Sequence, residues 1–566
     1  MKIRQVTPSN NIEVHLSNGI TLSGNRGTTA EEFIQAANVP ESDLIVGCVI
    51  NNTLKELTTK ITQESDIKPV TIRETDGARI YRRSLTYLLS AAFSTCFPNS
   101  ILHVDHSVFP NGYHCHVSSD LVLDDEKLKK LKTRMQTLID EKLPFIKQET
   151  PVEEAIEYFQ KIGINDKVEL FKYKKKDTVT LYKLKQYVDY QHGFMVPNTS
   201  YLKWFDIIRA NGGFTLRYPS RGNPLIIDTV KQYPRLLNTF QQYGQWLNKL
   251  GVENVGALNR AIVEGRTREL ILVSEALHEQ HIAAITQQIA EKKGQNRIIL
   301  ISGPSSSGKT TFSRKLAIQL LSKGISPFAI ELDNYFVNRD DTPRDEKGES
   351  DFESISALKL DLLNEHLSGL ISGKKVRLPK FNFKSGVSEP GEEVQLKSDQ
   401  MIIMEGIHGL NPSLIHTDLS SHAFKIYVSA LTQLNLDNQN RVSTTDTRLM
   451  RRIIRDNAHR GYKAADTITR WGSVERAEKK HIFPYQENAD VMFNSALVYE
   501  TSVIKPIIEP LLRQVPHNTP EYIEAKRLMA FLDWFLPIGS EIVPDISILR
   551  EFVGGSILND FTIWRG

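Results

Sequence analysis

The chain has 566 residues, of which 40% are hydrophobic and 24% charged, and its formal net charge is +3. This length predicts about three to five domains, and the composition is that of a folded globular protein rather than a disordered or fibrous one. A charge this small for the size does not by itself indicate a protein that binds nucleic acid or membranes.

Three cysteines, Cys48, Cys96 and Cys115, occur without a C-x-x-C pair. They support neither a disulfide framework nor a thiolate zinc site, so we expect a reducing compartment. The first residues show no apolar segment of signal-peptide type, and no run approaches the ~18 apolar residues of a membrane span. The sequence therefore predicts a cytoplasmic protein with no membrane partner.

Residues 1–65 alternate short β-like runs with turns, of which Ser17-Asn18-Gly19 is the clearest. The runs and one helical stretch lie at 12–16, 20–22, 30–37, 44–50 and 68–72. A hairpin followed by a helix and further strands predicts a small β-grasp module. This pattern resembles the TGS domain at the front of threonyl-tRNA synthetases.

Residues 66–215 continue this resemblance. The segment Arg82 to Leu89 is similar to the H-S-x-x-H-L-L helix of the synthetase editing domain, and Tyr187 to Met195 is similar to its Y-V-D-x-C-x-G-x-H motif. The family's two His, one Cys and one His form a metal-type constellation. Those four positions carry Arg83, Tyr87, Gln191 and Met195. Because these side chains do not suit a zinc-like site, we expect an α+β editing-like domain without metal ligands.

Two further features of this half admit two interpretations each. The turn Pro110-Asn111-Gly112 would bring His103, His106, His114 and His116 together. They form either a metal or nucleic-acid site or, as histidines occur at every burial level, a hairpin surface. Lysine-rich runs at 127–132 and 172–176 form either an RNA contact or a solvated face.

Residues 216–290 carry apolar side chains at helical spacing, from Leu236 to Leu250 and again from Leu270 to Ile289. This periodicity predicts a helical linker. The segment His278-Glu279-Gln280-His281 is one residue too short for the metalloprotease motif H-E-x-x-H.

The strongest motif is Gly303-Pro304-Ser305-Ser306-Ser307-Gly308-Lys309-Thr310, which fits the phosphate-binding loop G-x-x-x-x-G-K-[ST]. The apolar run 297–302 before it predicts a buried strand, and Phe312, Leu316 and Leu320 after it recur at helical spacing. A helix N-terminus offers unpaired N–H groups to phosphate, Lys309 reaches the β- and γ-phosphates, and the Thr310 hydroxyl can ligate Mg²⁺. The sequence therefore predicts binding of a nucleoside triphosphate.

Acidic and basic residues follow at the places where a phosphoryl-transfer enzyme needs them. The runs 328–333 and 401–406 predict strands that end near Asp333 and Glu405, and in a doubly wound sheet ligands gather at these strand ends. The segment 445–460 is dense in arginine, which indicates a lid that neutralises the transferred group, with a solvated helix face as the alternative.

Residues 297–495 resemble the uridine kinase and phosphoribulokinase group of P-loop kinases, through GPSSSGKTT, LDNYF, DFES, MEGIHGL and RRIIRD followed by RG. The resemblance implies ATP and Mg²⁺ as cofactors, with Asp333 as the base that accepts the sugar hydroxyl proton. It implies the following ATP-binding residues: Gly303, Pro304, Ser305, Ser306, Ser307, Gly308, Lys309, Thr310 and Thr311. It implies Thr310, Asp333 and Glu405 as Mg²⁺ ligands.

The same resemblance names the remaining site residues. Catalysis would also use Lys309 and the lid arginines Arg452, Arg455 and Arg460. Glu353 stands where the family has an Asp that holds the ribose hydroxyls, and Phe336 and Phe381 fall in the substrate pocket, Phe381 in the place of a Tyr. Gly386 falls where uridine kinases have a base-reading His, so the identity of the base stays open.

The sequence thus predicts an α/β chain with a P-loop kinase domain whose parallel sheet is flanked by helices. The predicted boundaries are 1–65 (TGS-like), 66–215 (editing-like), 216–290 (helical linker), 291–495 (kinase) and 496–566 (C-terminal helical extension). The leading hypothesis is phosphorylation of the 5′-hydroxyl of a uridine- or cytidine-like or broader ribonucleoside. The alternatives are a kinase of another small hydroxylated metabolite and a tRNA- or translation-linked NTP-binding regulator. Whether the chain contacts RNA or forms a homo-oligomer stays open.

Overall fold

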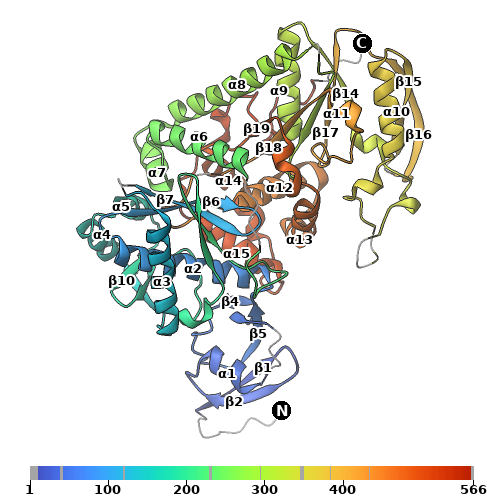
Figure 1. Cartoon of the computed structure of the whole chain (residues 1–566). Helices are drawn as coiled ribbons and strands as arrows, with labels where there is room; N and C mark the ends of the chain where they lie inside the picture. Colours follow the sequence, from blue (N-terminus) through green and yellow to red (C-terminus); the bar gives the residue numbers. More distant parts are fainter. Residues whose placement is uncertain are drawn as a thin grey trace.

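The structure is a computed structural model that describes residues 10–38, 43–118, 121–228, 233–293, 295–344, 348, 350–382, 384–432 and 434–561. Figure 1 shows a small sheet near the N-terminus at one end of the molecule and a larger sheet at the other, with helical layers between them. Mixed and parallel sheets covered by helices confirm the predicted α/β class.

The first module is a five-stranded sheet of order β2-β1-β5-β3-β4, covered by helix α1. Its elements are β1 (Asn11–Leu16), β2 (Thr21–Asn25), α1 (Ala30–Ala36), β3 (Ile45–Ile50), β4 (Thr53–Lys55) and β5 (Ser65–Thr71). Strand β5 pairs in parallel with β1 and antiparallel with β3. A boundary at residue 65 would remove this strand from its sheet, so we place the end of the module after Thr71.

The second module packs helix α2 against two antiparallel sheets, β11-β12-β7-β6 and β10-β9-β8. Its helices are α2 (Thr75–Cys96), α3 (Asp125–Asp140), α4 (Val152–Lys161) and α5 (Asn165–Lys172). Its strands are β6 (Ile101–Val108), β7 (Gly112–Ser118), β8 (Ile146–Pro151), β9 (Thr178–Leu184), β10 (Tyr187–Tyr190), β11 (Asp206–Ala210) and β12 (Gly213–Arg217). Three helices follow: α6 (Pro234–Leu250), α7 (Val255–Val263) and α8 (Thr267–Glu291).

The C-terminal half, which the sequence predicts to be a kinase, is built on a parallel sheet of order β14-β17-β13-β18-β19. Its strands are β13 (Ile298–Ser302), β14 (Ser326–Glu331), β17 (Gln400–Glu405), β18 (Ala423–Ser429) and β19 (Val491–Asn494). Side chains alternate along β13: Ile299 and Ile301 pack under α8 and α9 (Lys309–Ser322), while Ile298 and Leu300 pack under α10 (Leu360–Ile371). Both faces of the sheet are therefore covered, as a parallel sheet requires.

The remaining elements extend this half. A two-stranded ribbon, β15 (Lys375–Asn382) and β16 (Val387–Gln395), lies beside α10. The helices are α11 (Thr417–Ser420), α12 (Thr444–Arg460), α13 (Ala464–His481), α14 (Glu500–Arg513), α15 (Glu521–Leu532) and α16 (Arg550–Val553). Within the described residues, no helix combines the length and apolar composition needed to cross a bilayer.

One apolar core crosses the predicted domain boundaries. It joins side chains of α4, α5, β9 and β10 with those of α6 to α8, α12, α14 and α15, so that Phe171, Leu258, Ile453 and Phe531 belong to a single cluster. The predicted linker and C-terminal extension are therefore part of the packing that connects the two halves.

A buried charge cluster lies inside this junction. The Lys167 side chain on α5 has no solvent exposure, and its Nζ lies 3.1 Å from Asp189 Oδ1 and 3.3 Å from Asp437 Oδ1. Asp189 belongs to the Y-V-D motif at the end of β10, and Asp437 to the loop between β18 and α12. Burial raises the pKa of Asp189, and Lys167 opposes the shift. An ammonium buried this deeply requires such partners.

The two lysine-rich runs make contacts with the protein itself. Lys132 Nζ of α3 lies 2.6 Å from Asp206 Oδ1. In the second run, Lys174 Nζ lies 3.7 Å from the ring centre of Trp534, and Lys176 Nζ lies 3.8 Å from Asp533 Oδ2. The second run therefore helps to hold the C-terminal helices.

Replacing Lys167 with Ala should destabilise the whole chain, because it leaves Asp189 and Asp437 buried without their cation. Removal of one partner of a buried ion pair typically costs about 3–5 kcal/mol. Urea unfolding of the full chain would measure the cost, with Lys172→Ala, at an exposed position of the same helix, as the matched control. Equal midpoints for the two variants would contradict this role.

Candidate functional site

The loop between β13 and α9 has the geometry of an anion-binding cradle. Its backbone turns through two left-handed residues, Ser306 at φ 56° and Gly308 at φ 82°. At Gly303 a Cβ atom would lie 1.9 Å from the carbonyl oxygen of Val428, so only glycine fits there. A loop of this shape at a helix N-terminus directs backbone N–H groups toward a phosphate.

The polar groups of the loop are partly paired within the protein. The Lys309 ammonium donates to the carbonyl oxygens of Gly303 (2.9 Å) and Pro304 (3.0 Å). Burial lowers the pKa of Lys309, while the carboxylates of Glu405, Glu551 and Glu478 oppose the shift. Among the described residues, the buried hydroxyl oxygens of Ser306 and Ser307 have no hydrogen-bond partner. The loop therefore keeps polar groups available for a ligand.

Two strands bring acids to this loop. Strand β17 is the direct neighbour of β13, and the Thr310 hydroxyl donates to Glu405 Oε1 at 2.9 Å. Burial raises the pKa of Glu405, and its second oxygen is buried without a partner among the described residues. Asp333 follows β14, the next strand, in the short turn Leu332–Tyr335. Burial and Glu331 raise the pKa of Asp333, and Lys309 opposes the shift.

These residues fit the two cofactors that the sequence predicts. The loop amides and Lys309 suit the phosphates of ATP. A buried carboxylate with one unpaired oxygen, beside a threonine hydroxyl, is a hard oxygen donor set of the kind that Mg²⁺ prefers.

The three predicted lid arginines gather around one acid of their own helix, Asp456 on α12. Arg452 Nε lies 3.2 Å and Arg460 Nη1 3.1 Å from its carboxylate, and Arg455 Nε lies 3.9 Å away. Arg452 also donates to the Ser305 hydroxyl at 2.8 Å. The helix therefore places Arg452 on the loop and holds the other two beside it.

Sequence reasoning missed two further arginines on the buried face of α12. Arg448 donates to both oxygens of Glu478 on α13 (2.5 and 2.8 Å), and Glu478 Oε1 accepts the Ser305 N–H at 2.9 Å. Arg451 pairs with Glu500 in the same way and lies 3.4 Å from the Ser306 carbonyl oxygen. The spacing of Arg448 and Arg451, one helical turn apart, was visible in the sequence, but the acids that pair with them, Glu478 and Glu500, were not.

The C-terminal segment also reaches the loop, where the sequence predicted only packing. Glu551 on α16 accepts a hydrogen bond from the Thr311 hydroxyl at 2.8 Å, and its carboxylate lies 3.9 Å from Arg455 Nη1. Nearby, a Cβ on Gly308 would lie 2.6 Å from Ile548. We found no signal in the sequence that connects this segment with the loop.

The predicted substrate residues lie in two groups. Phe336 and Phe381 make an edge-to-face ring contact with centroids 5.8 Å apart. Glu353 is open to solvent on one side, and partial burial raises its pKa while Arg452 opposes the shift. At Gly386, whose φ is 74°, an added Cβ would lie 2.7 Å from the Arg339 side chain. An imidazole at this position would therefore displace Arg339.

Three of the four editing-type positions make hydrogen bonds within the protein, and the fourth, Gln191, is buried. Arg83 Nη1 donates to the Phe194 carbonyl oxygen at 2.8 Å, and the Tyr87 hydroxyl donates to the Tyr182 carbonyl oxygen. Met195 is buried, and its sulfur accepts a hydrogen bond from Ser84 at 3.7 Å. Gln191 is also buried. These contacts are those of a packed interior.

The β6–β7 hairpin places the four histidines in two cross-strand pairs. The rings of His103 and His116 stack with centroids 4.5 Å apart, and those of His106 and His114 are 5.1 Å apart. Stacked rings present their faces, not their nitrogen atoms, to each other. Where the structure is described, the three ligand-type groups that meet within 4.8 Å are Glu13, His15 and Glu64, in the first module.

Comparison with known proteins separates the chain into the same two halves. Residues 298–502 match the Phosphoribulokinase / Uridine kinase family. A uridine kinase of Halobacterium salinarum is 28% identical over 193 residues, which are 34% of this chain and 77% of that protein. A threonine–tRNA ligase of Lawsonia intracellularis is 30% identical over 175 residues of the N-terminal region, 31% of this chain. The chain spans 27% of the length of that ligase.

The solved structures that match part of the chain are more distant in sequence. They include a possible uridine kinase from Bacillus stearothermophilus (18% identity, TM-score 0.26) and a putative fructose transport system kinase from Silicibacter sp. TM1040 (18% identity, TM-score 0.28). Each covers 38% of this chain and is itself covered to 98%. The chain thus joins an N-terminal region similar to threonine–tRNA ligases to a P-loop region, residues 298–502, that matches the Phosphoribulokinase / Uridine kinase family.

Proposed function

We propose that this protein transfers the terminal phosphoryl group of ATP to the 5′-hydroxyl of a ribonucleoside. The observation that carries the proposal is the convergence of Lys309, Thr310 and Glu405 at the P-loop, with Asp333 on the adjacent strand end. Phosphoryl transfer needs positioning and charge neutralisation more than covalent chemistry by the protein. ATP with Mg²⁺ supplies the phosphoryl group and the metal charge.

The chain's own groups have separate tasks in this proposal. Lys309 leaves its carbonyl partners to bind phosphate oxygens, and Arg452 approaches the transferred group from Ser305. Asp333 accepts the proton of the attacking hydroxyl. A pKa above that of an ordinary aspartate brings this carboxylate closer to the pH at which a general base works best.

Acceptor selection rests on Glu353, Phe336 and Phe381. A carboxylate at 353 can accept hydrogen bonds from both ribose hydroxyls, and the two rings can pack against a base. The close approach of Arg339 to Gly386 favours loose base selection. The same observation supports a second candidate acceptor, a small hydroxylated metabolite without a base.

The experiment that tests the proposal is ADP formation with a panel of ribonucleosides, 2′-deoxyribonucleosides and sugars, with the phosphorylated position identified by NMR. We expect 5′-phosphorylation of ribonucleosides by the wild type and none by Lys309→Ala. Turnover of sugars alone would establish the second candidate, and no turnover of any acceptor would overturn the proposal.

Asp333→Asn should lower kcat by about 10²–10⁴-fold with a small change in KM, because a positioned general base typically contributes this much. Since the carboxylate acts when deprotonated, wild-type kcat should fall as the pH drops through the raised pKa of Asp333. The variant should lose this acidic limb. Asp361→Asn, at an exposed position in the first turn of α10, is the control. A wild-type kcat in Asp333→Asn would remove Asp333 from the mechanism.

Glu353→Gln should reduce the preference for ribonucleosides over 2′-deoxyribonucleosides, by about tenfold in kcat/KM. The reason is the loss of charge-assisted hydrogen bonds to the ribose. Steady-state kinetics with uridine and 2′-deoxyuridine would measure the ratio, and Glu365→Gln on the exposed side of α10 is the matched control. An unchanged ratio would show that Glu353 does not contact the ribose.

A further inference from the structure

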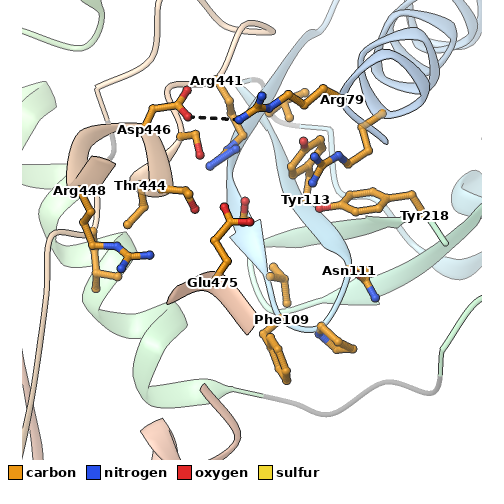
Figure 2. A pocket seen from close by; sticks show the side chains of 18 of the residues that line it. Arg79, Phe109, Asn111, Tyr113, Tyr218, Arg441, Thr444, Asp446, Arg448 and Glu475 are labelled. Carbon is orange, nitrogen blue, oxygen red and sulfur yellow. Dashed lines mark ion pairs between the residues drawn. The ribbon is translucent and has the colours of Figure 1, made fainter. Parts of the chain in front are cut away.

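A second pocket, of about 360 Å³, lies where the second module meets the kinase half. Figure 2 shows its walls: Arg79 from α2, Tyr113 from β7, Arg441 ahead of α12 and Glu475 from α13 point toward a common space. None of these residues belongs to the proposed catalytic set. The volume falls within the range of about 300–1,000 Å³ that small-molecule sites occupy.

Positive charge dominates this pocket. Its described lining residues include eight arginine or lysine side chains and three carboxylates. The cations are Arg79, Arg82, Arg83, Arg221, Arg441, Arg448, Lys479 and Arg527. Two of the acids are already paired, Asp446 with Arg527 at 2.7 and 2.8 Å and Glu478 with Arg448. Arg79 pairs with two acids outside the lining, Asp76 at 3.1 Å and Glu524 at 2.6 Å. Glu475 therefore remains as the single lining carboxylate for the other five cations.

One charge on α2, that of the partly buried Arg83, has no ion-pair partner among the described residues. Burial lowers the pKa of Arg83 to about 10, and the positive charges of Arg527 and Arg79 act in the same direction. Its guanidinium donates a hydrogen bond to a neutral group, the Phe194 carbonyl oxygen. Burial also lowers the pKa of the His192 imidazole to about 3, and the positive charge of Arg83 adds to this shift. A guanidinium in such surroundings costs free energy unless an anion joins it.

Hydrogen-bond donors without a partner also indicate that the ligand of this pocket is an anion. Gln191 is 3% exposed, and its Nε2 has no hydrogen-bond partner in the described part of the chain; the same holds for Arg441 Nε. Helix α12 begins at the pocket, with Ser443, Thr444 and Thr445 in the lining and no side chain capping the first turn. The N-terminus of a 17-residue helix adds a further partial positive charge.

The opposite wall of the pocket is aromatic and can contact the apolar part of a ligand. Phe109 and Phe240 line it. The rings of Tyr113 and Tyr218 belong to the cationic side instead, where the guanidinium carbons of Arg441 and Arg82 lie 5.0 and 5.4 Å from their centres. Figure 2 places Phe109 and Asn111 across the pocket from Arg441. One end is therefore cationic and the other aromatic.

We propose that this pocket binds a small phosphate-bearing molecule with an aromatic ring, of nucleoside monophosphate size. The phosphate meets Arg82, Arg441 and the first turn of α12, and the ring packs against the aromatic wall. This site is distinct from the P-loop, but the two share Pro304, Arg448 and Glu478. An anion bound in the pocket competes with Glu478 for Arg448. Because Glu478 also accepts the Ser305 N–H of the P-loop, a bound ligand alters the kinase site. This coupling rests on the proposed function, whereas the binding does not.

Calorimetric titration of the full chain with uridine 5′-monophosphate tests the binding. A saturating non-hydrolysable ATP analogue with Mg²⁺ occupies the P-loop, and Glu353→Gln weakens the acceptor site. We expect one remaining site, with affinity lowered about tenfold or more by Arg441→Gln and by Arg82→Gln. Arg209→Gln, an equal change of charge on exposed β11, should bind like the wild type. Equal affinity in all these variants, or no binding, would overturn the proposal.

Thermal unfolding separates a ligand-binding role from a structural one. Without ligand, Arg441→Gln should melt within about 2 °C of the wild type or above it, because it removes a charge surrounded by like charges. It should lose the rise in Tm that the monophosphate produces in the wild type. A large fall in Tm without ligand would assign Arg441 to the fold instead. An eight-nucleotide single-stranded RNA is the alternative ligand. If it binds more tightly than the monophosphate, and if Arg441→Gln and Arg82→Gln abolish this binding, the ligand of the pocket is RNA and the small-molecule proposal is wrong.

The coupling has its own readout. Added monophosphate should change kcat of the wild type and leave kcat of Arg441→Gln unaltered. If the monophosphate binds as expected but no acceptor is phosphorylated, the proposed function fails while the site stands. If phosphorylation is intact and the pocket variants bind normally, the site fails while the function stands.

Discussion

The junction of the two halves depends on one buried ammonium group. Lys167 lies in the interior with Asp189 and Asp437, and these acids come from opposite sides of the junction. An isolated charge at that depth would be too costly, so the three groups must be buried together or not at all. The Gln439 side chain completes the arrangement by accepting from the same Nζ at 2.6 Å. The loop before α12 is thereby fixed to the second module, and with it the start of the helix that carries the lid arginines.

Helix α12 accordingly serves two purposes on two faces. On its buried face, Arg448 and Arg451 form ion pairs whose side chains are almost fully buried. The same two arginines contact the carbonyl oxygens of Ser305 and Ser306 in the P-loop. On its other face Arg452, Arg455 and Arg460 share the single carboxylate of Asp456. Arg455 also lies 3.9 Å from the Glu551 carboxylate, so three guanidinium groups face two acids. This leaves a net positive charge beside the loop, which is the charge that a transferred phosphoryl group needs.

The sequence predicts the parts of this site that depend on local chemistry. The P-loop, its strand and its helix follow from eight consecutive residues and their apolar flanks. Asp333 and Glu405 follow from strand ends, because β14, β17 and β13 are neighbours in a parallel sheet. The strands of the first module follow from alternation and turns, and β5, which pairs with β1, extends past the predicted boundary at residue 65. The second module was predicted from the resemblance of two of its segments to the synthetase editing domain.

The parts that could not be predicted depend on partners far apart in the chain. Glu478 and Glu551 meet the loop from 173 and 240 residues away, and neither differs in its local sequence from an ordinary helical glutamate. The burial of Lys167 could not be predicted for the same reason. The sequence of α5 does not show that Asp189 and Asp437, from distant segments, will surround this lysine. Tertiary packing selects these partners, and a single sequence carries no record of that selection.

The common core has a consequence for how the chain can be divided. Phe171 and Tyr190 of the second module pack on Trp534 of the C-terminal segment, and the Lys167 ammonium pairs with Asp189 and Asp437 across the junction. A cut at the junction would expose these rings and leave the buried charges without their partners. The two halves of this chain are therefore expected to be less soluble and less stable apart than together.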